Sequence, residues 1–211
     1  MNQRLLATDG PAQLLRVGRA LRQAAGNPVA ANGGALPPLI LVTDAARVPD
    51  PLPAAGRLPE GSAVLLRHYG WPQRQALAEA LAKLCRTRGV LLLIGADADL
   101  AREVGADGLH LREAMLDAPP PRRPGIVTAA VHSAAAVAKA AAIGADAVLA
   151  APVFETTSHP GRVPLGIAGL RAIVQAGRLP VFALGGVSAL NAETLLGSGA
   201  AGIAAVGALA D

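Results

Sequence analysis

The 211-residue sequence has few cysteines, aromatic residues and lysines. Its single cysteine, Cys85, excludes a disulfide within the chain and any zinc or iron–sulfur site built from several cysteines. Aromatic residues make up 2% of the chain, too few to line the stacking groove of a single-strand nucleic-acid binder. Lysine accounts for only two of the 19 basic residues, and the arginines are scattered. The net charge of +4 therefore fits a small phosphorylated ligand better than a nucleic acid.

Long hydrophobic runs are also missing. No apolar stretch reaches the roughly 18 residues of a membrane span, because charged residues, glycine and proline interrupt each one. The first residues lack the apolar core of a signal peptide. We therefore expect a cytoplasmic protein that binds neither membrane nor nucleic acid. Since domains usually hold about 100–200 residues, we expect one domain or at most two small ones.

From residue 38 onward, short apolar runs alternate with amphipathic segments. Continuous apolar runs are typical of parallel strands buried on both faces, and we expect strands at Leu39–Thr43, Ala63–Arg67, Val90–Ile94, Gly108–Leu111, Ile126–Val131, Ala147–Ala151, Val181–Leu184 and Gly202–Val206. Apolar spacings of three and four predict helices at Gln73–Arg88, Asp97–Val104, Ser133–Ile143, Ile167–Ala176 and Ser188–Leu196. Ser133 and Ser188 stand where helix N-caps belong. The connections after the first and fourth strands are too short or too rich in proline for full helices.

Repeated strand–helix units predict an α/β fold, a single small (β/α)₈ TIM barrel with an additional N-terminal helix. The alternative, an open doubly wound sheet, usually has a glycine-rich turn after its first strand, and Thr43–Ala46 contains no glycine. We place the barrel in residues 38–211. Residues 1–37 are expected to form a helix at Pro11–Ala25, capping the bottom of the barrel, and a Gly/Pro-rich connector.

Glycines and hydroxyls occur at the carboxyl ends of the expected strands, where barrels of this kind carry their active sites. Gly185 and Gly186 follow the seventh strand, and Gly207 follows the eighth. Glycine lets backbone N–H groups approach an anion closely, and the loops after strands seven and eight are the usual phosphate site of this architecture. The loop after the sixth strand adds the hydroxyls of Thr156 and Ser158. We therefore expect a small phosphorylated ligand.

Three histidines are candidates for proton transfer. His110 ends the fourth strand, His132 follows the fifth, and His159 lies in the loop after the sixth. An imidazole that titrates near its working pH is a capable acid or base, whereas a histidine at a strand end is as often a structural hydrogen-bonding residue. Arg67, at the end of the second strand, is suited to pair with a diphosphate or carboxylate. No His-x-His or Glu-x-x-His spacing indicates a transition-metal site.

Taken in order, the motifs resemble the thiamin phosphate synthase/TenI family of small (β/α)₈ barrels. The resemblance runs from about Leu39 to the C-terminus and rests on Leu41–Asp44, Ala106–Leu111, Pro152–Thr156, Ala183–Val187 and Gly199–Leu209. In that family the synthase joins a hydroxymethylpyrimidine diphosphate to a thiazole phosphate, with help from Mg²⁺, and releases pyrophosphate. TenI proteins include a tautomerase that acts on a thiazole carboxylate phosphate, with a histidine proposed for proton transfer.

This sequence departs from the synthase pattern at the positions that the resemblance assigns to the metal. Gly95 and Ala96 stand where the synthase has an Asn-Asp pair, and Met115 stands near its second acidic ligand. Glycine, alanine and methionine side chains supply no oxygen ligand for Mg²⁺. Carboxylates at neighbouring positions that could substitute are Asp44, Asp97 and Glu113. We assign no metal site, and Mg²⁺ is expected only if synthase activity is retained.

By the resemblance, the part of the site that holds the thiazole phosphate is retained in this sequence. It implies that substrate and phosphate are bound by Arg67, Thr156, Ser158, Gly185, Gly186, Val206 and Gly207. His132 matches the histidine of a TenI stretch, here Ala130–Ser133. The resemblance implies a protein that binds a thiazole phosphate or thiamin phosphate. It is expected to be either a TenI-like protein, in which His132 transfers a proton with help from His159 or His110, or a divergent synthase.

Two other functions stay open at this point. One is an active thiamin phosphate synthase with a rewired Mg²⁺ site, and the other is a non-catalytic protein that binds a thiamin precursor. A synthase would need Mg²⁺ and both substrates, whereas a tautomerase would need neither the metal nor the second substrate. A homo-oligomer is likewise left open.

Overall fold

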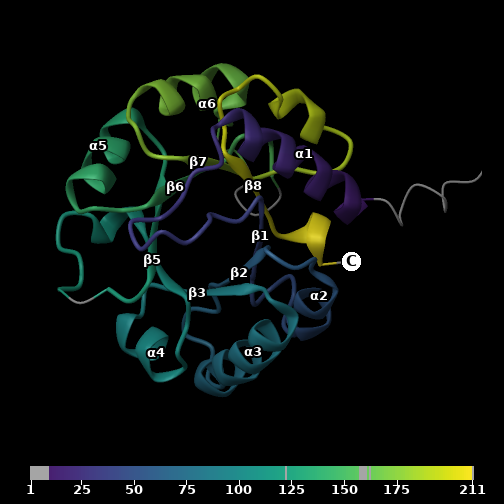
Figure 1. The fold of residues 1–211 in the computed structure, drawn as a ribbon, viewed down its shortest axis with the longest axis vertical. Helices are drawn as coiled ribbons and strands as arrows, with labels where there is room; N and C mark the ends of the chain where they lie inside the picture. The colour runs from purple at the N-terminus through teal and green to yellow at the C-terminus, as the bar shows by residue number, and fades with distance from the viewer. Residues whose placement is uncertain (1–9, 122, 157–160, 162, 211) are drawn as a thin grey trace, which may run out of the picture.

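The structure is a computed structural model that describes residues 10–121, 123–156, 161 and 163–210. Parallel strands form a closed barrel in sequence order (Figure 1). They are β1 Leu39–Val42, β2 Ala63–Leu66, β3 Leu91–Gly95, β4 Gly108–Leu111, β5 Ile126–Val131, β6 Ala147–Ala150, β7 Val181–Leu184 and β8 Gly202–Ala205. Pairing of Leu39 with Ile203 joins β1 to β8 and closes the barrel. The predicted (β/α)₈ fold is confirmed, and each predicted strand end lies within one residue of the observed end.

Helices surround the barrel (Figure 1). They are α1 Gly10–Ala24, α2 Leu52–Arg57, α3 Arg74–Arg88, α4 Ala98–Glu103, α5 Ala134–Ala142 and α6 Gly166–Gln175, with the short 3₁₀ helices η2 Glu113–Met115, η3 Ala192–Leu195 and η4 Gly207–Leu209. As predicted, the described residues after β4 form no α-helix and contain only the 3₁₀ helix η2. The connection after β1 was also predicted to be too short or too rich in proline for a full helix, but it contains the six-residue α-helix α2. The Ser133 hydroxyl accepts a hydrogen bond from the backbone N–H of Ala136 at 3.2 Å and so caps α5. Within the described residues, none of the helices has the length and hydrophobicity needed to cross a membrane.

The helix predicted at Ser188–Leu196 is wrong, because this stretch holds only η3. The Asn191 side chain bridges the loop instead. Its amide donates to the carbonyl of Gly186 (2.8 Å), and its oxygen accepts from the backbone N–H of Ser188 (2.9 Å). Ser188 is therefore a turn residue, and its side chain does not cap a helix. The bridge fixes the loop after β7 at the mouth of the barrel.

Two apolar layers hold the barrel together. Inside it, alternate strand residues pack against one another, including Ile40, Leu65, Leu93, Leu149 and Phe182. The opposite faces of the strands pack against the surrounding helices. Filling of the interior by branched and aromatic side chains is the usual construction of such barrels. The interior is therefore a packed core, and open space is left for polar groups only where the strands end.

The connector, and not α1, closes the bottom of the barrel, so the expectation for α1 is wrong. Ala30 and Leu36 of the connector are buried against the interior core, and the backbone N–H of Ala31 donates to Asp146 just before β6 (2.6 Å). Figure 1 shows the connector crossing from α1 toward β5 and β6 and back to β1. Helix α1 packs on the outside against β1 and β8. Because only the short η4 follows β8, that face would otherwise lack a helix.

Candidate active site

A cavity of about 710 Å³ opens at the carboxyl ends of the strands. This volume lies within the range of small-molecule sites. Its lining contains the predicted site residues that the structure describes, namely Arg67, His110, His132, Thr156, Gly185, Gly186, Val206 and Gly207. The remaining two, Ser158 and His159, lie outside the described residues. The barrel thus gathers these residues, which are far apart in the sequence, around one cavity.

Glu113 and His132 form a hydrogen-bonded pair in this lining. One carboxylate oxygen, Oε2 of Glu113, accepts from the backbone N–H of His132 (2.8 Å) and from its ring nitrogen Nδ1 (2.6 Å). Because a carboxylate oxygen only accepts, the ring proton lies on Nδ1 and the neutral ring carries its lone pair on Nε2. The two side chains are 33% and 37% exposed, so ligand and solvent can reach them. The pair therefore holds the imidazole in one orientation, with Nε2 left to interact with a ligand.

His110 lies deeper than His132, with only 4% of its surface exposed. Its Nδ1 is 2.9 Å from the hydroxyl of Thr128 on the neighbouring strand. Burial, together with repulsion from the Arg67 guanidinium, lowers the pKa of His110 to about 3. The ring therefore stays neutral near pH 7. It can exchange hydrogen bonds with a ligand, but it does not carry the extra proton of an imidazolium acid.

A buried hydrogen-bond chain positions Arg67. The Thr43 hydroxyl accepts from the backbone N–H of Arg67 (2.9 Å) and lies 2.8 Å from Nδ1 of His68. Nε2 of His68 lies 3.2 Å from the carbonyl of Pro49, which can only accept. His68 therefore donates through Nε2 and accepts the hydroxyl proton of Thr43 through Nδ1. The Thr43 hydroxyl and both ring nitrogens of His68 thus have hydrogen-bond partners, and these bonds hold the backbone of Arg67 in place at the end of β2.

The glycines after β7 are required by both conformation and space. Gly185 has φ +94° and Gly186 has φ +67°, which side chains other than glycine rarely adopt. A Cβ at Gly186 would lie 2.3 Å from the carbonyl oxygen of Glu155, and one at Gly185 would lie 2.8 Å from Cα of Pro152. The loops after β6 and β7 are therefore in direct contact, and the hydroxyl-bearing loop is held beside the glycines.

An arginine lies against the end of β8. A Cβ at Gly207 would lie 2.7 Å from a guanidinium nitrogen of Arg47, which belongs to the loop after β1. The Asp44 carboxylate holds that loop, because its Oδ1 accepts from the backbone N–H groups of Ala46 (3.1 Å) and Arg47 (3.2 Å). A guanidinium beside a glycine turn offers both positive charge and N–H donors. Both features favour binding of a phosphate group on this side of the cavity.

Tyr69 occupies the space above the end of β3. A Cβ at Gly95 would lie 2.8 Å from the Tyr69 hydroxyl oxygen. The guanidinium carbons of Arg112 and Arg74 lie 5.2 and 5.7 Å from the centre of the Tyr69 ring, within the range of cation–π contacts. Burial raises the pKa of the Tyr69 phenol, although Arg67, Arg112 and Arg74 oppose that rise. Tyr69 is therefore surrounded by arginines.

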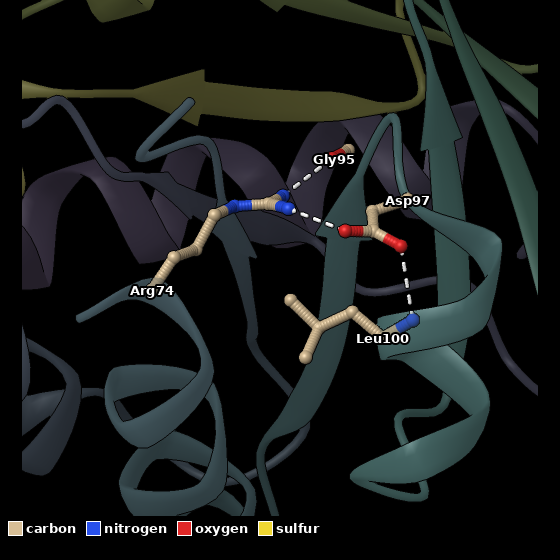
Figure 2. A network of polar contacts seen from close by, with 4 residues as sticks. All are labelled: Arg74, Gly95, Asp97 and Leu100. Atoms are coloured by element: carbon tan, nitrogen blue, oxygen red, sulfur yellow. Dashed lines mark hydrogen bonds and ion pairs between the residues drawn. The ribbon is translucent and has the colours of Figure 1, made fainter. Parts of the chain in front are cut away.

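The residues at the expected metal positions do not fit a magnesium ion. Gly95, Ala96 and Met115 supply no carboxylate. The neighbouring Asp97 is already committed: Oδ2 accepts from Arg74 (2.9 Å), and Oδ1 accepts from the backbone N–H of Leu100 (2.9 Å) and caps α4 (Figure 2). Arg74 also donates to the carbonyl of Gly95 (2.5 Å). In the part of the chain that the structure describes, no three His, Cys, Asp or Glu residues gather as a metal site.

Sequence reasoning did not pair Glu113 with His132, and it did not assign Tyr69, Arg47 and Arg112 to the site. All of them line the cavity. Their shared signal is position, because each follows the carboxyl end of a strand by a few residues. Charged and aromatic residues placed this way around a barrel converge on one mouth, but only the strand register shows which of them meet.

Comparison with known proteins agrees with this geometry. A family model described as thiamine monophosphate synthase matches residues 39–209. The chain is 37% identical over 174 residues to the thiamine-phosphate synthase of Methanoculleus marisnigri, a match that covers 79% of each protein. It is also 37% identical over 141 residues to the thiamine-phosphate synthase of Prochlorococcus marinus strain MIT 9313, covering 65% of this chain and 40% of that longer protein.

A solved structure shows the same fold. Thiamine phosphate pyrophosphorylase from Pyrococcus furiosus superposes with a TM-score of 0.67 and 29% identity, covering 81% of this chain and 85% of that one. The family model extends from β1 to η4 and so includes every strand that contributes to the cavity. On these grounds the chain belongs to the thiamin phosphate synthase/TenI family.

Proposed function

We propose that this barrel binds a thiazole phosphate or a thiamin phosphate and catalyses a proton transfer of the TenI tautomerase type. The observation that carries the proposal is the Glu113–His132 pair. Its two hydrogen bonds fix the histidine tautomer and leave Nε2 as the base. Proton transfer within one ligand also needs no metal, which agrees with the donor set at the expected metal positions.

The phosphate end of the ligand is assigned to the side of the cavity formed by the loops after β6, β7 and β8. Gly185, Gly186 and Gly207 allow close approach of the backbone, and Thr156 offers a hydroxyl. Arg47 supplies positive charge there. Anchoring of the phosphate would place the heterocycle over the centre of the mouth, within reach of residues from β4 and β5.

The reaction would proceed in two proton transfers. Nε2 of His132 removes a proton from a ring carbon, and the electron pair of that C–H bond moves into the ring system. The Glu113 carboxylate stabilises the imidazolium that forms. His132 then returns the proton at another ring position, so the ligand is isomerised and the enzyme is regenerated. His110, which stays neutral, is assigned a hydrogen bond to the ligand, and His159 is retained as an assisting group.

The synthase reaction is a second candidate, favoured by the names of the relatives. It joins two substrates and, by the family resemblance, uses Mg²⁺. The positions that would hold the metal carry Gly95, Ala96 and Met115. The synthase candidate therefore predicts an activity that depends on added Mg²⁺ and on the pyrimidine diphosphate, and the tautomerase predicts an activity that depends on neither.

The test is turnover of a thiazole carboxylate phosphate in EDTA without a second substrate. We expect isomerisation by the natural protein and a loss of about 10²–10⁴-fold in His132→Ala, the usual contribution of a general base. Glu113→Gln should be slower than the natural protein because it cannot stabilise the imidazolium. Glu193→Gln is the matched control, since Glu193 is exposed on η3 and paired with Arg16.

Three results would contradict the proposal. Unchanged turnover in His132→Ala would remove the assigned base. Thiamin phosphate formed from both synthase substrates with Mg²⁺, with no isomerisation in EDTA, would favour the synthase. Tight binding of the thiazole phosphate without turnover in either assay would leave the non-catalytic binder.

A further inference from the structure

The side of the cavity formed by β2, β3 and β4 carries a cluster that the proton transfer does not use. Arg67 follows β2 and Arg112 follows β4, and both line the cavity together with Tyr69. Tyr69 stands over the end of β3 and packs against the Arg112 guanidinium at 5.2 Å. We call Arg67, Tyr69 and Arg112 the arginine–tyrosine cluster.

The guanidinium groups of this cluster are not satisfied within the protein. Among the described residues, no atom accepts a hydrogen bond from the guanidinium of Arg67 or Arg112, and no carboxylate forms an ion pair with either one. Arg67 is partly buried, and a guanidinium has five N–H donors that must find acceptors. The nitrogens of Arg67 and Arg112 are not among the buried unpaired atoms of the described residues, so their donors are open to the cavity, where an anionic ligand can accept from them.

Carboxylates in the loops after β1, β3 and β4 are already engaged, and Glu155, which also lines the cavity, belongs to the loop after β6. Asp97 accepts from Arg74 and from the start of α4. Glu113 accepts twice from His132, and Asp44 accepts from the backbone of its own loop. The positive charge of Arg67 and Arg112 is therefore directed at the cavity contents. At the end of β3, Gly95 and the Tyr69 ring take up the space in which a metal-binding side chain would stand.

We propose that Arg67 and Arg112 bind an anionic oxygen group of the ligand directly, in place of the divalent cation that the family resemblance implies. The ligand then carries two anionic ends, one at the glycine loops and one at the arginine–tyrosine cluster. The second end is recognised by its oxygens, which belong to a phosphate or a carboxylate. This inference rests on the proposed function for the first end only.

The chemistry of arginine suits this role. The planar guanidinium presents paired N–H donors that match two oxygens of one phosphate or carboxylate. The Tyr69 ring packs against the Arg112 guanidinium and limits its motion, so less freedom is lost on binding. Unlike a bound metal, this arrangement needs no carboxylate ligands. The absence of carboxylates at positions 95, 96 and 115 is consistent with direct binding of the anion by arginine.

Calorimetric titration of the full chain with inorganic diphosphate tests the proposal. We expect binding in EDTA, and we expect added Mg²⁺ to leave the dissociation constant unchanged or to raise it. Arg67→Ala and Arg112→Ala should each weaken binding by about ten- to a hundred-fold, the usual worth of hydrogen bonds to a charged group. Arg19→Ala, on the exposed face of α1, is the matched control and should bind like the natural protein.

Several outcomes would overturn the proposal: no binding in EDTA, binding that requires Mg²⁺, or unchanged binding in both arginine variants. Thermal unfolding of each variant shows whether Arg67→Ala folds, and the exposed Arg112 provides an independent variant. A parallel titration with malonate separates the two oxygen sources, because the tighter of the two arginine-dependent probes identifies a phosphate or a carboxylate. The titration needs no turnover, so it can confirm anion binding by the arginine–tyrosine cluster even if the proton transfer at His132 is not observed. It can likewise exclude that binding even if the proton transfer is observed.

Discussion

At the scale of single residues, burial decides what the histidines of the cavity can do. His110 and His132 both lie at carboxyl ends of neighbouring strands. His110 is almost fully enclosed and packs near Arg67, so its charged form is disfavoured twice. His132 is partly exposed and has a carboxylate on Nδ1. Two histidines of similar position therefore differ in chemistry: His110 stays a neutral hydrogen-bonding group, and His132 is the base of the proposed proton transfer.

The depressed pKa of His110 predicts acid sensitivity of the folded state. The unfolded chain binds this proton with the ordinary pKa of 6.5, whereas folding lowers the pKa to about 3. Below pH 6.5 the unfolded state binds more protons, so the free energy of unfolding falls by about 1.4 kcal/mol per pH unit down to the folded pKa. Between pH 7 and pH 5 we expect a loss of about 2 kcal/mol from this residue.

Urea unfolding of the natural protein and of His110→Asn at pH 7 and pH 5 measures this loss. Asparagine keeps a hydrogen-bonding group beside Thr128 but does not titrate. The natural protein should therefore lose about 2 kcal/mol more than the variant over this interval. Equal losses in the two proteins would show that His110 does not take up a proton on unfolding.

At the scale of elements, the conformation of the loop after β7 depends on glycine and on hydrogen bonds from the side chain of Asn191. Gly186 combines a positive φ with a close backbone contact to the loop after β6. Asn191 then fastens the Gly186 carbonyl and the Ser188 N–H. These contacts replace the helix expected there. The loop can therefore present its backbone to a phosphate without a long helix behind it.

Gly186→Ala tests this loop, with Gly197→Ala as its control. Gly197 has a similar φ of +75° but nothing within 4 Å of its would-be Cβ. A left-handed alanine costs about 1–2 kcal/mol, and we expect that loss alone in Gly197→Ala. Gly186→Ala should unfold more easily and bind inorganic phosphate more weakly in a calorimetric titration, because the Cβ displaces the neighbouring loop. Equal stability and equal phosphate binding in the two variants would contradict this role.

At the scale of the whole molecule, α1 completes the ring of helices around the barrel, because no long helix follows β8 in the described residues. Helix α1 packs against β8 and β1, where η4 is too short to cover the barrel. Gly18 makes the contact possible, since a Cβ there would lie 2.4 Å from the Pro38 carbonyl oxygen. Leu14, Val17 and Leu21 of α1 are fully buried in this contact. The N-terminal segment is therefore part of the barrel's stability.

Two glycine-to-alanine variants in helices measure that contribution. Gly56 in α2 has open space around its would-be Cβ, so Gly56→Ala should stabilise the protein by about 0.5–1 kcal/mol through helix propensity. Gly18→Ala gains the same propensity but forces α1 away from Pro38, and overpacking of this kind costs about 1–3 kcal/mol. Thermal unfolding should thus shift in opposite directions. A stabilised Gly18→Ala variant would show that α1 does not pack closely against Pro38.

Much of the fold could be predicted because its signals are local. Continuous apolar runs such as Ile126–Val131 predict buried parallel strands, and Ser133 predicts a helix start from its own hydroxyl. The expected phosphate and base residues also lie at strand ends, where the architecture places its site. Ser188 shows the limit, because a side-chain bridge from Asn191 competed with the helix that its spacing predicts.

The sequence by itself determined the barrel, its strand order and the set of residues near its mouth, since apolar periodicity and strand ends are properties of short segments. The tertiary structure alone decided which of those residues meet. Glu113 reaches His132 because β4 and β5 are neighbours in the barrel, and Tyr69 covers Gly95 because β2 and β3 are. Contacts between strand ends depend on register and barrel closure, which no single segment encodes. The contacts of the cavity were therefore decided by the pairing of neighbouring strands.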